Sequence, residues 1–287
     1  MFFYLITTDH LEDRLWFRDD EDFKTGMNYA ATVAFLVGVN ILSFILMSNH
    51  VHFVLECTEE QARTFITEYK RLYSHYLSKK YQTAELLRNN DIDIQRLTLG
   101  DESLERAIAY VQMNCVAANI CMNPAEYRWG TGITFFQSTP RTGQPLGSYS
   151  KRAQIRMLHS KLDLPSDWIV GEEGYVLPSS YVCVKFVENL FRTPKRMNYF
   201  LVNSSKAKRR LALKEEGIPS FRDQVILAAV QDLCQTLFHQ QSVANLNEEQ
   251  QSVLVSQIRR RFSADINQIA RVTGIPLSDA ARMLEGF

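Results

Sequence analysis

The stretch Ile41-Leu-Ser-Phe-Ile-Leu-Met-Ser-Asn-His-Val-His-Phe-Val-Leu55 decides the fold of this chain. Its two apolar runs are broken only by Ser48-Asn49, which predicts a hairpin or a bulged strand. Because residues two apart in a strand point to the same face, His50 and His52 should emerge side by side on an open face. The residues that alternate with them should enter the core from the opposite face, and these are Val51, Phe53 and Leu55.

Strand and helix patterns alternate on both sides of this stretch. The expected order is strand, helix, two strands, helix, a loop with a short strand, and helix, over Phe2–Thr7, Asp20–Val37, Ile41–Met47, His50–Leu55, Glu59–Tyr81, Leu87–Gly100 and Glu102–Asn119. Asp101 is expected to cap the last helix. This order predicts an α+β fold in which helices cover an antiparallel sheet.

The character of the chain changes after Trp129. Gly130–Ser150 is rich in Gly, Pro, Ser and Thr and indicates a boundary, and residues 151–203 indicate short helical pieces. From Ser220 to Phe287 the pattern is helical without a strand. We therefore predict an all-helical C-terminal region and a division of the chain into residues 1–140, 141–205 and 206–287.

Basic and acidic residues are unevenly distributed between the two halves of the chain. The 287 residues hold 32 basic and 32 acidic side chains, but residues 1–150 hold 13 and 18 whereas residues 151–287 hold 19 and 14. The basic half is the expected surface for nucleic acid.

Tyr29–Met47 has no charge, but Gly38, Asn40 and Ser43 interrupt it, so we expect a buried helix end and strand and no membrane span. The five cysteines are scattered along the chain, and free thiols of this kind indicate a reducing cytosol. They are Cys57, Cys115, Cys121, Cys183 and Cys234.

Two adjacent imidazoles are suited to clamping a divalent metal, although such a pair can also be simply hydrogen-bonded on a strand. Tyr110 and Asn114 lie one helical turn apart on one face of the predicted helix. A carboxamide oxygen is an acceptable ligand for Mg²⁺ or Mn²⁺, and an activated phenol could attack a phosphorus atom. The alternatives are a core tyrosine and a surface or capping asparagine. Tyr69, Tyr73 and Tyr76 are further candidate nucleophiles, but their helical spacing favours a core stripe.

Four blocks of the sequence resemble the REP-associated tyrosine transposases, a family of HUH (His-hydrophobic-His) single-strand nucleases. Leu46–Leu55 is similar to the family signature LMPNHVHLL, and Tyr110–Ala118 to its YIHxNPVRA helix. Further segments resemble its conserved blocks in the same order along the chain, at Trp16-Phe-Arg-Asp-Asp20 and Asn123-Pro-Ala-Glu-Tyr-Arg-Trp129.

The resemblance implies a ferredoxin-like HUH domain, usually dimeric, that acts on single-stranded or hairpin DNA in the bacterial cytoplasm, close to the nucleoid. It implies that His50, His52 and Asn114 bind the metal, Mg²⁺ or Mn²⁺. Tyr110 would be the nucleophile that forms a 5′-phosphotyrosyl link and releases a 3′-hydroxyl. The implied activity is that of a transposase, with DNA cleavage and rejoining without an external energy source.

Several positions depart from the family pattern. Ser48 and Cys115 stand where the family usually has proline, Gln112 where histidine is common, and Ala117 where arginine is common. A transposon-derived DNA-binding protein or regulator without catalytic activity is therefore the alternative. An unrelated metal hydrolase is a third reading, but it needs carboxylate ligands that the sequence does not place.

The segment Ala264–Leu284 is typical of a helix-turn-helix, with Ala270 and Gly274 at the usual small-residue spacing and Ser278 as a cap for the second helix. A helix-turn-helix is expected to bind duplex DNA. The alternative is a helical hairpin that makes no DNA contact. The basic run Lys206–Lys214 is either a solvated linker or a DNA-tracking segment. The candidate DNA-binding residues are Lys206, Lys208, Arg209, Arg210, Arg259, Arg260, Arg261, Arg271 and Arg282.

Overall fold

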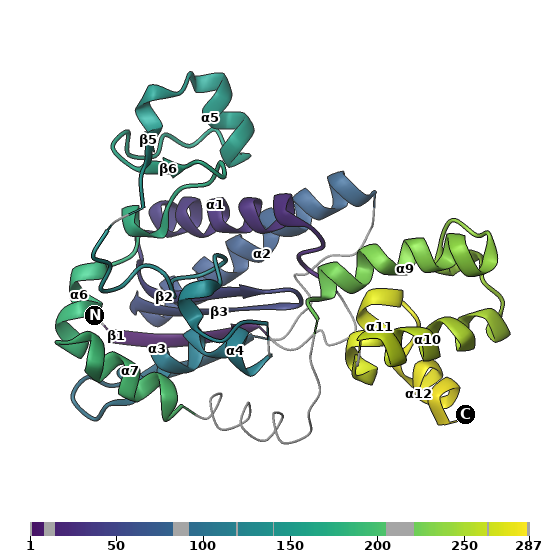
Figure 1. The fold of residues 1–287 in the computed structure, drawn as a ribbon. Coiled ribbons are helices and arrows are strands. Elements are labelled where there is room, and N and C mark those ends of the chain that lie inside the picture. Colours follow the sequence, from purple (N-terminus) through teal and green to yellow (C-terminus); the bar gives the residue numbers. More distant parts are fainter. Residues whose placement is uncertain are drawn as a thin grey trace.

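A computed structural model of the chain describes residues 2–8, 15–82, 92–118, 120–139, 141–204, 221–262 and 264–285. Its first part is a four-stranded antiparallel sheet in the order β2-β3-β1-β4, with helix α1 between β1 and β2 and helix α2 between β3 and β4 (Figure 1). This connection is the ferredoxin-like arrangement, so the predicted α+β class is confirmed. The bounds are β1 (Phe2–Thr8), α1 (Asp20–Val37), β2 (Asn40–Met47), β3 (His50–Cys57), α2 (Glu59–Tyr81) and β4 (Ile92–Leu97).

The β2–β3 pair is the predicted hairpin, and it is also bulged. Met47 pairs with His50 across a two-residue turn at Ser48-Asn49, and the register shifts between Ile41 and Ser43. Phe53 lies against the α2 side chains Phe65 and Tyr69, with ring centroids 4.9 and 5.3 Å apart. Val51, Phe53 and Leu55 are all fully buried, which confirms the face assigned to them.

Local capping fixes where the two sheet-covering helices begin. The carboxylate of Asp19 accepts from the Asp22 amide, and the Asp22 side chain accepts in return from the Asp19 amide. Thr58 and Gln61 make the same reciprocal pair at the start of α2. Such capping boxes satisfy backbone donors that a helix leaves unpaired, and the observed bounds of α1 and α2 coincide with the predicted ones.

The other face of the sheet is covered by α3 (Ser103–Gln112) and α4 (Asn114–Ala117), which lie below it in Figure 1. The sequence predicted one helix over Glu102–Asn119, which is wrong, because the helix is interrupted at Met113. Its first cap is Glu102 in the left-handed region, with φ 65°, although Asp101 still accepts a hydrogen bond from the Ser103 amide at 2.9 Å.

Residues 141–204 form a small layer outside α1 and along the sheet. The two-stranded ladder of β5 with β6 was not predicted, since neither three-residue strand has a periodicity of its own. Leu146, Leu158 and Val176 pack there against Ala31 of α1. The elements are β5 (Gly143–Pro145), α5 (Lys151–Leu158), β6 (Ile169–Gly171), α6 (Val184–Phe191) and α7 (Pro194–Val202), with short 3-10 turns at Leu146–Ser148 and Pro178–Ser180. Two further 3-10 turns lie outside this layer, at Pro124–Glu126 and Val243–Asn245.

The C-terminal helices enclose a hydrophobic cluster of their own, formed within residues 226–284. Helix α11 ends at Thr273 and is capped by Gly274, whose φ of 73° suits glycine. Helix α12 begins three residues after this cap, which gives the predicted helix-turn-helix shape. Ser278 is not its cap, because α12 already begins at Leu277. The helices are α9 (Asp223–Phe238), α10 (Glu248–Phe262), α11 (Ile266–Thr273) and α12 (Leu277–Glu285).

Two sequence expectations fall on residues outside the described ranges. The domain boundaries at 140 and 205 lie there, so the division into three domains stays a prediction. The basic residues Lys206, Lys208, Arg209 and Arg210 lie there as well. None of the described helices is long and apolar enough to cross a membrane.

A buried carboxylate joins the start of α1 to the end of α2. Asp22 has no exposed surface and lies 2.7 Å from the ammonium of Lys80. The hydroxyls of Tyr76 and Tyr81 donate to it at 2.9 and 2.8 Å, and the amide of Arg18 donates at 2.7 Å. A buried charge with this many donors is strongly favoured over a neutral replacement that leaves them unsatisfied.

We expect Asp22→Asn to lower the free energy of unfolding by about 3 kcal/mol, because it leaves Lys80 and several donors without their carboxylate. Urea denaturation followed by tryptophan fluorescence measures this. Asp20→Asn is the matched control, since Asp20 lies in the same helical turn but is largely exposed, and it should cost less than about 1 kcal/mol. Equal losses in the two variants would contradict the role given to Asp22.

Candidate functional site

Three of the residues singled out by the sequence lie together. The imidazole rings of His50 and His52 have centroids 4.8 Å apart, and the ring of Tyr110 meets that of His52 edge-on at 5.5 Å. Strand β3 carries both histidines on the sheet face that α3 covers. The structure therefore joins a histidine pair and a tyrosine that are distant in sequence.

Each imidazole is oriented by a neighbouring polar side chain. The Nδ1 atom of His50 lies 2.9 Å from Oδ1 of Asn49, and Nδ1 of His52 lies 3.0 Å from Oγ1 of Thr7 on β1. Proteins use such Nδ1 contacts to fix the ring so that Nε2 is the metal-binding atom. In both rings Nε2 is shielded from solvent.

The expected open face is wrong for one of the two histidines. His52 has no exposed surface, because α3 closes over the middle of β3, whereas His50 and Tyr110 are half-buried at the edge of this contact. The strand period correctly placed both rings on one face, but it carries no information on what packs against that face.

The donor set fits a divalent metal in part. Asn114, 3% exposed, donates through Nδ2 to the Tyr110 carbonyl at 2.9 Å and to the Val111 carbonyl at 3.2 Å. These bonds use the amide nitrogen, and the oxygen is the atom that Mg²⁺ or Mn²⁺ prefers. No group of three or more His, Cys, Asp or Glu suited to a metal occurs among the described residues. A metal here would thus need His50, His52 and Asn114 together.

Two of the other sequence blocks contact the β2–β3 hairpin. The Ser48 carbonyl accepts from the amides of Trp16 and Phe17 at 2.8 and 3.0 Å. Farther along β2, the Leu46 carbonyl accepts from the Tyr127 hydroxyl at 2.7 Å, and the Leu46 amide donates to the Trp129 carbonyl at 2.8 Å. Two segments that are distant in sequence, one before β2 and one after α4, thus support the strand pair that carries the histidines.

The alternative tyrosines belong to the core on the opposite face of the sheet. Tyr69 and Tyr73 are fully buried on α2, and burial raises the pKa of both hydroxyls well above the usual range. Burial and the charge of Asp22 raise the pKa of Tyr76 to about 12. None of these phenols is placed like Tyr110, which touches the histidine pair.

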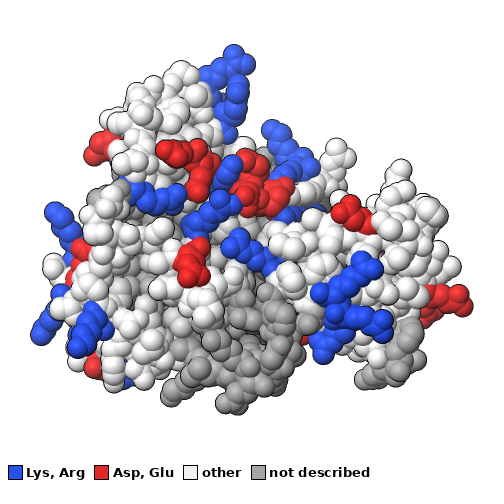
Figure 2. All heavy atoms as spheres, in the orientation of Figure 1, with Lys and Arg blue, Asp and Glu red and all other residues white. Residues whose placement is uncertain are grey.

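The described arginines of the C-terminal helices differ in availability. Arg260 and Arg261 are exposed at the end of α10, and Arg259 is exposed while donating to the Ala264 carbonyl at 2.6 Å. Figure 2 shows basic side chains gathered over these helices. Arg282 is exposed but lies 2.8 Å from Glu248, and Arg271 is 14% exposed and lies 3.1 Å from Asp223.

Sequence reasoning missed Asp223, which links the C-terminal helices to the histidine hairpin. Its carboxylate accepts from the Ser48 hydroxyl at 2.5 Å, from Gln268 at 2.8 Å and from Arg271 at 3.1 Å. Nearby, the side-chain Nε2 of Gln224 donates to the Phe17 carbonyl at 2.8 Å. An aspartate at the start of a helix is an ordinary feature, so nothing local indicated this contact.

Comparisons with known proteins give one structural likeness. No protein-family model and no curated protein matches the sequence. A solved structure described as the REP-associated tyrosine transposase bound to a REP hairpin is similar, with a TM-score of 0.36 and 8% identity, over 58% of this chain and 90% of that chain. The fold assignment rests on the strand order and connections of this chain itself.

We expect Asp223→Ala to loosen the hairpin turn, because Ser48 loses its acceptor and Arg271 loses its counter-charge. Hydrogen exchange of the Trp16 and Phe17 amides, which donate to Ser48, should accelerate about tenfold or more. Asp232→Ala is the matched control, since Asp232 is exposed on the same helix. Exchange that is unchanged by Asp223→Ala would show that the contact does not support the turn.

Proposed function

We propose that this protein is a metal-dependent single-strand DNA endonuclease and strand transferase with Tyr110 as the nucleophile. One observation carries the proposal, which is the contact of the Tyr110 ring with the His50–His52 pair. The resemblance of Leu46–Leu55 and Tyr110–Ala118 to two transposase blocks implies that these residues share one catalytic task.

The residues divide the work by position. His50, His52 and Asn114 would hold Mg²⁺ or Mn²⁺, which when bound polarises a DNA phosphate. Asn49 and Thr7 orient the two imidazoles through their Nδ1 atoms. The Asn114 amide holds the helix at Tyr110 by its bond to the Tyr110 carbonyl, so the nucleophile is fixed close to the proposed ligands.

The chemistry is a transesterification that conserves the energy of the phosphodiester. The Tyr110 oxygen gives up its proton to solvent or a base and bonds to phosphorus, and the bond from phosphorus to the 3′-oxygen breaks. The 3′-oxygen takes up a proton and leaves as a hydroxyl, while the 5′-phosphate stays on the tyrosine. Attack by a 3′-hydroxyl reverses the step and rejoins a strand.

The C-terminal helices would supply affinity for DNA. Arg259, Arg260 and Arg261 form an exposed positive group at the end of α10, and such groups contact phosphates without reading bases. Arg271 is engaged with Asp223, and Arg282 with Glu248, so these two would contribute less. The basic run at 206–210 and a homodimer remain predictions.

The complete burial of His52 favours one second candidate, a DNA-binding protein derived from a transposase that no longer cleaves. A catalytic metal must meet the substrate, and α3 closes over this histidine. This candidate shares the DNA-binding surface of α10 with the first and differs in the chemistry alone.

The experiment is an adduct assay with hairpin DNA that carries a single-stranded flank and a 3′ label, because the strand that stays on the tyrosine is the one that runs on to the 3′ end. With Mg²⁺ or Mn²⁺ the full chain should yield a denaturant-stable protein–DNA adduct, and Tyr110→Phe should reduce it at least 100-fold, because the nucleophilic oxygen is lost. Tyr199→Phe is the matched control, since Tyr199 is 61% exposed on α7, and its adduct should be unchanged.

The same samples separate the two candidates. Replacing Arg259, Arg260 and Arg261 by alanine should weaken salt-dependent binding but spare the adduct at saturating DNA. Binding without any adduct from the unmodified chain would support the non-cleaving candidate. An undiminished adduct in Tyr110→Phe would exclude Tyr110 as the nucleophile.

A further inference from the structure

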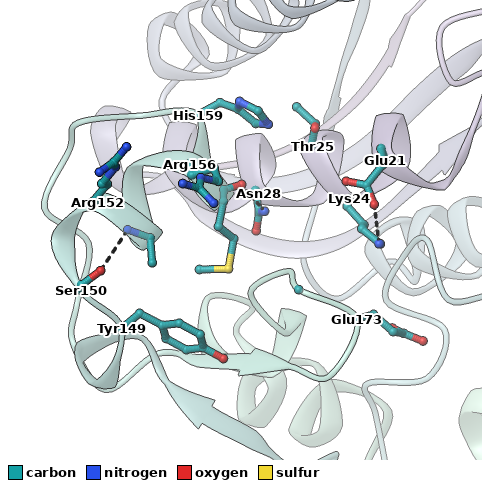
Figure 3. Close-up of a pocket in the computed structure, with 13 residues that line it drawn as sticks. Glu21, Lys24, Thr25, Asn28, Tyr149, Ser150, Arg152, Arg156, His159 and Glu173 are labelled. Carbon is teal, nitrogen blue, oxygen red and sulfur yellow. Dashed lines mark hydrogen bonds and ion pairs between the residues drawn. The ribbon is translucent and has the colours of Figure 1, made fainter.

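A cavity of about 620 Å³ lies between α1 and α5 (Figure 3). Helix α5 lies on the side of α1 that faces away from the sheet (Figure 1). The helix layer and the sheet separate the cavity from the face that carries His52 and Tyr110. Cavities of this volume accommodate small organic ligands. The site proposed for strand transfer does not use this cavity.

The walls of the cavity are fixed in place by buried contacts. Asn28, 1% exposed, donates to the Met157 carbonyl at 3.0 Å and accepts from the Val176 amide at 2.9 Å. The ring of His159, at the end of α5, lies 5.4 Å from that of Tyr76. Helix α5 is thereby held against α1, so the cavity is preformed.

Positive charge dominates the α5 wall. Arg152 and Arg156 stand one helical turn apart and both line the cavity (Figure 3). No ion pair joins either arginine to another described residue, whereas the acids of the lining are engaged. Glu21 lies 2.6 Å from Lys24, and Glu173 lies 2.8 Å from Arg141 and 3.5 Å from Arg128.

His159, at the end of α5, also lines the cavity. Desolvation and the nearby Lys79 lower the pKa of His159, with Glu21 opposing them. The rings of Tyr29 and Tyr76 face it from α1 and α2. An anion in the cavity would stabilise the imidazolium and raise this pKa, which gives a local signal for ligand binding.

We propose that the cavity between α1 and α5 binds a phosphate-bearing ligand of nucleotide size through Arg152 and Arg156. Two guanidinium groups one turn apart offer paired donors to phosphate oxygens, and Arg is the side chain best suited to that geometry. Tyr149 adds a flat ring and a hydroxyl, and Thr25 adds a second hydroxyl. The phosphate can belong to a free nucleotide or to a nucleic-acid strand.

Calorimetric titration of the full chain tests the site with adenosine monophosphate, adenosine, inorganic phosphate and a single-stranded oligonucleotide. The monophosphate should bind, adenosine should bind at least about tenfold more weakly, and NMR should show the His159 pKa rising with the monophosphate. Arg152→Gln with Arg156→Gln should weaken binding at least about tenfold, by loss of charge-assisted hydrogen bonds. Arg63→Gln with Arg71→Gln, on exposed α2 positions, is the matched control.

Each outcome decides the proposal. Binding of the oligonucleotide alone, lost with the two α5 arginines, would support the phosphate site and assign the phosphate to a strand. Equal affinity for adenosine and its monophosphate, or binding that the two substitutions leave unchanged, would overturn it. Tyr110→Phe should bind the monophosphate as the unmodified chain does. The cavity proposal and the strand-transfer proposal can therefore be overturned separately.

Discussion

The turn residue Ser48 is the point on which the arrangement of this molecule depends. Its carbonyl holds the Trp16–Phe17 segment, and its hydroxyl donates to Asp223 of the C-terminal helices. Because the turn has only two residues, these contacts act directly on the strand that begins at His50. The serine side chain supplies this hydroxyl, so the residue at position 48 connects the turn to the C-terminal helices.

Local chemistry explains which parts of the fold were predictable from sequence. The bounds of α1 and α2 followed from acidic starts and apolar periodicity, and the structure shows capping boxes at Asp19 and Thr58. The β5–β6 ladder could not be predicted, because each strand is three residues long and is defined by its partner. The break at Met113 could not be predicted either, because the sequence on both sides of it is helical and nothing local marks the interruption.

The site shows the same division between local and distant information. A period of two placed His50 and His52 on one face, but the contact with Tyr110 joins separate elements, which no spacing rule brings together. The burial of His52 and the pairing of Arg271 with Asp223 depend on tertiary packing that no spacing rule contains. Charge asymmetry between the halves indicates the C-terminal arginines as a DNA-binding surface, which stays a prediction, and it does not distinguish exposed side chains from paired ones.

We propose that His50, His52 and Asn114 hold a divalent cation beside the ring of Tyr110. Titration of the full chain with Mn²⁺, observed through the imidazole NMR signals of its 6 histidines, tests this most directly. We expect paramagnetic broadening to affect His50 and His52 first, and His50→Ala to abolish the selective loss at His52. Broadening that is absent, or that affects all histidines equally, would contradict a cation site at this histidine pair.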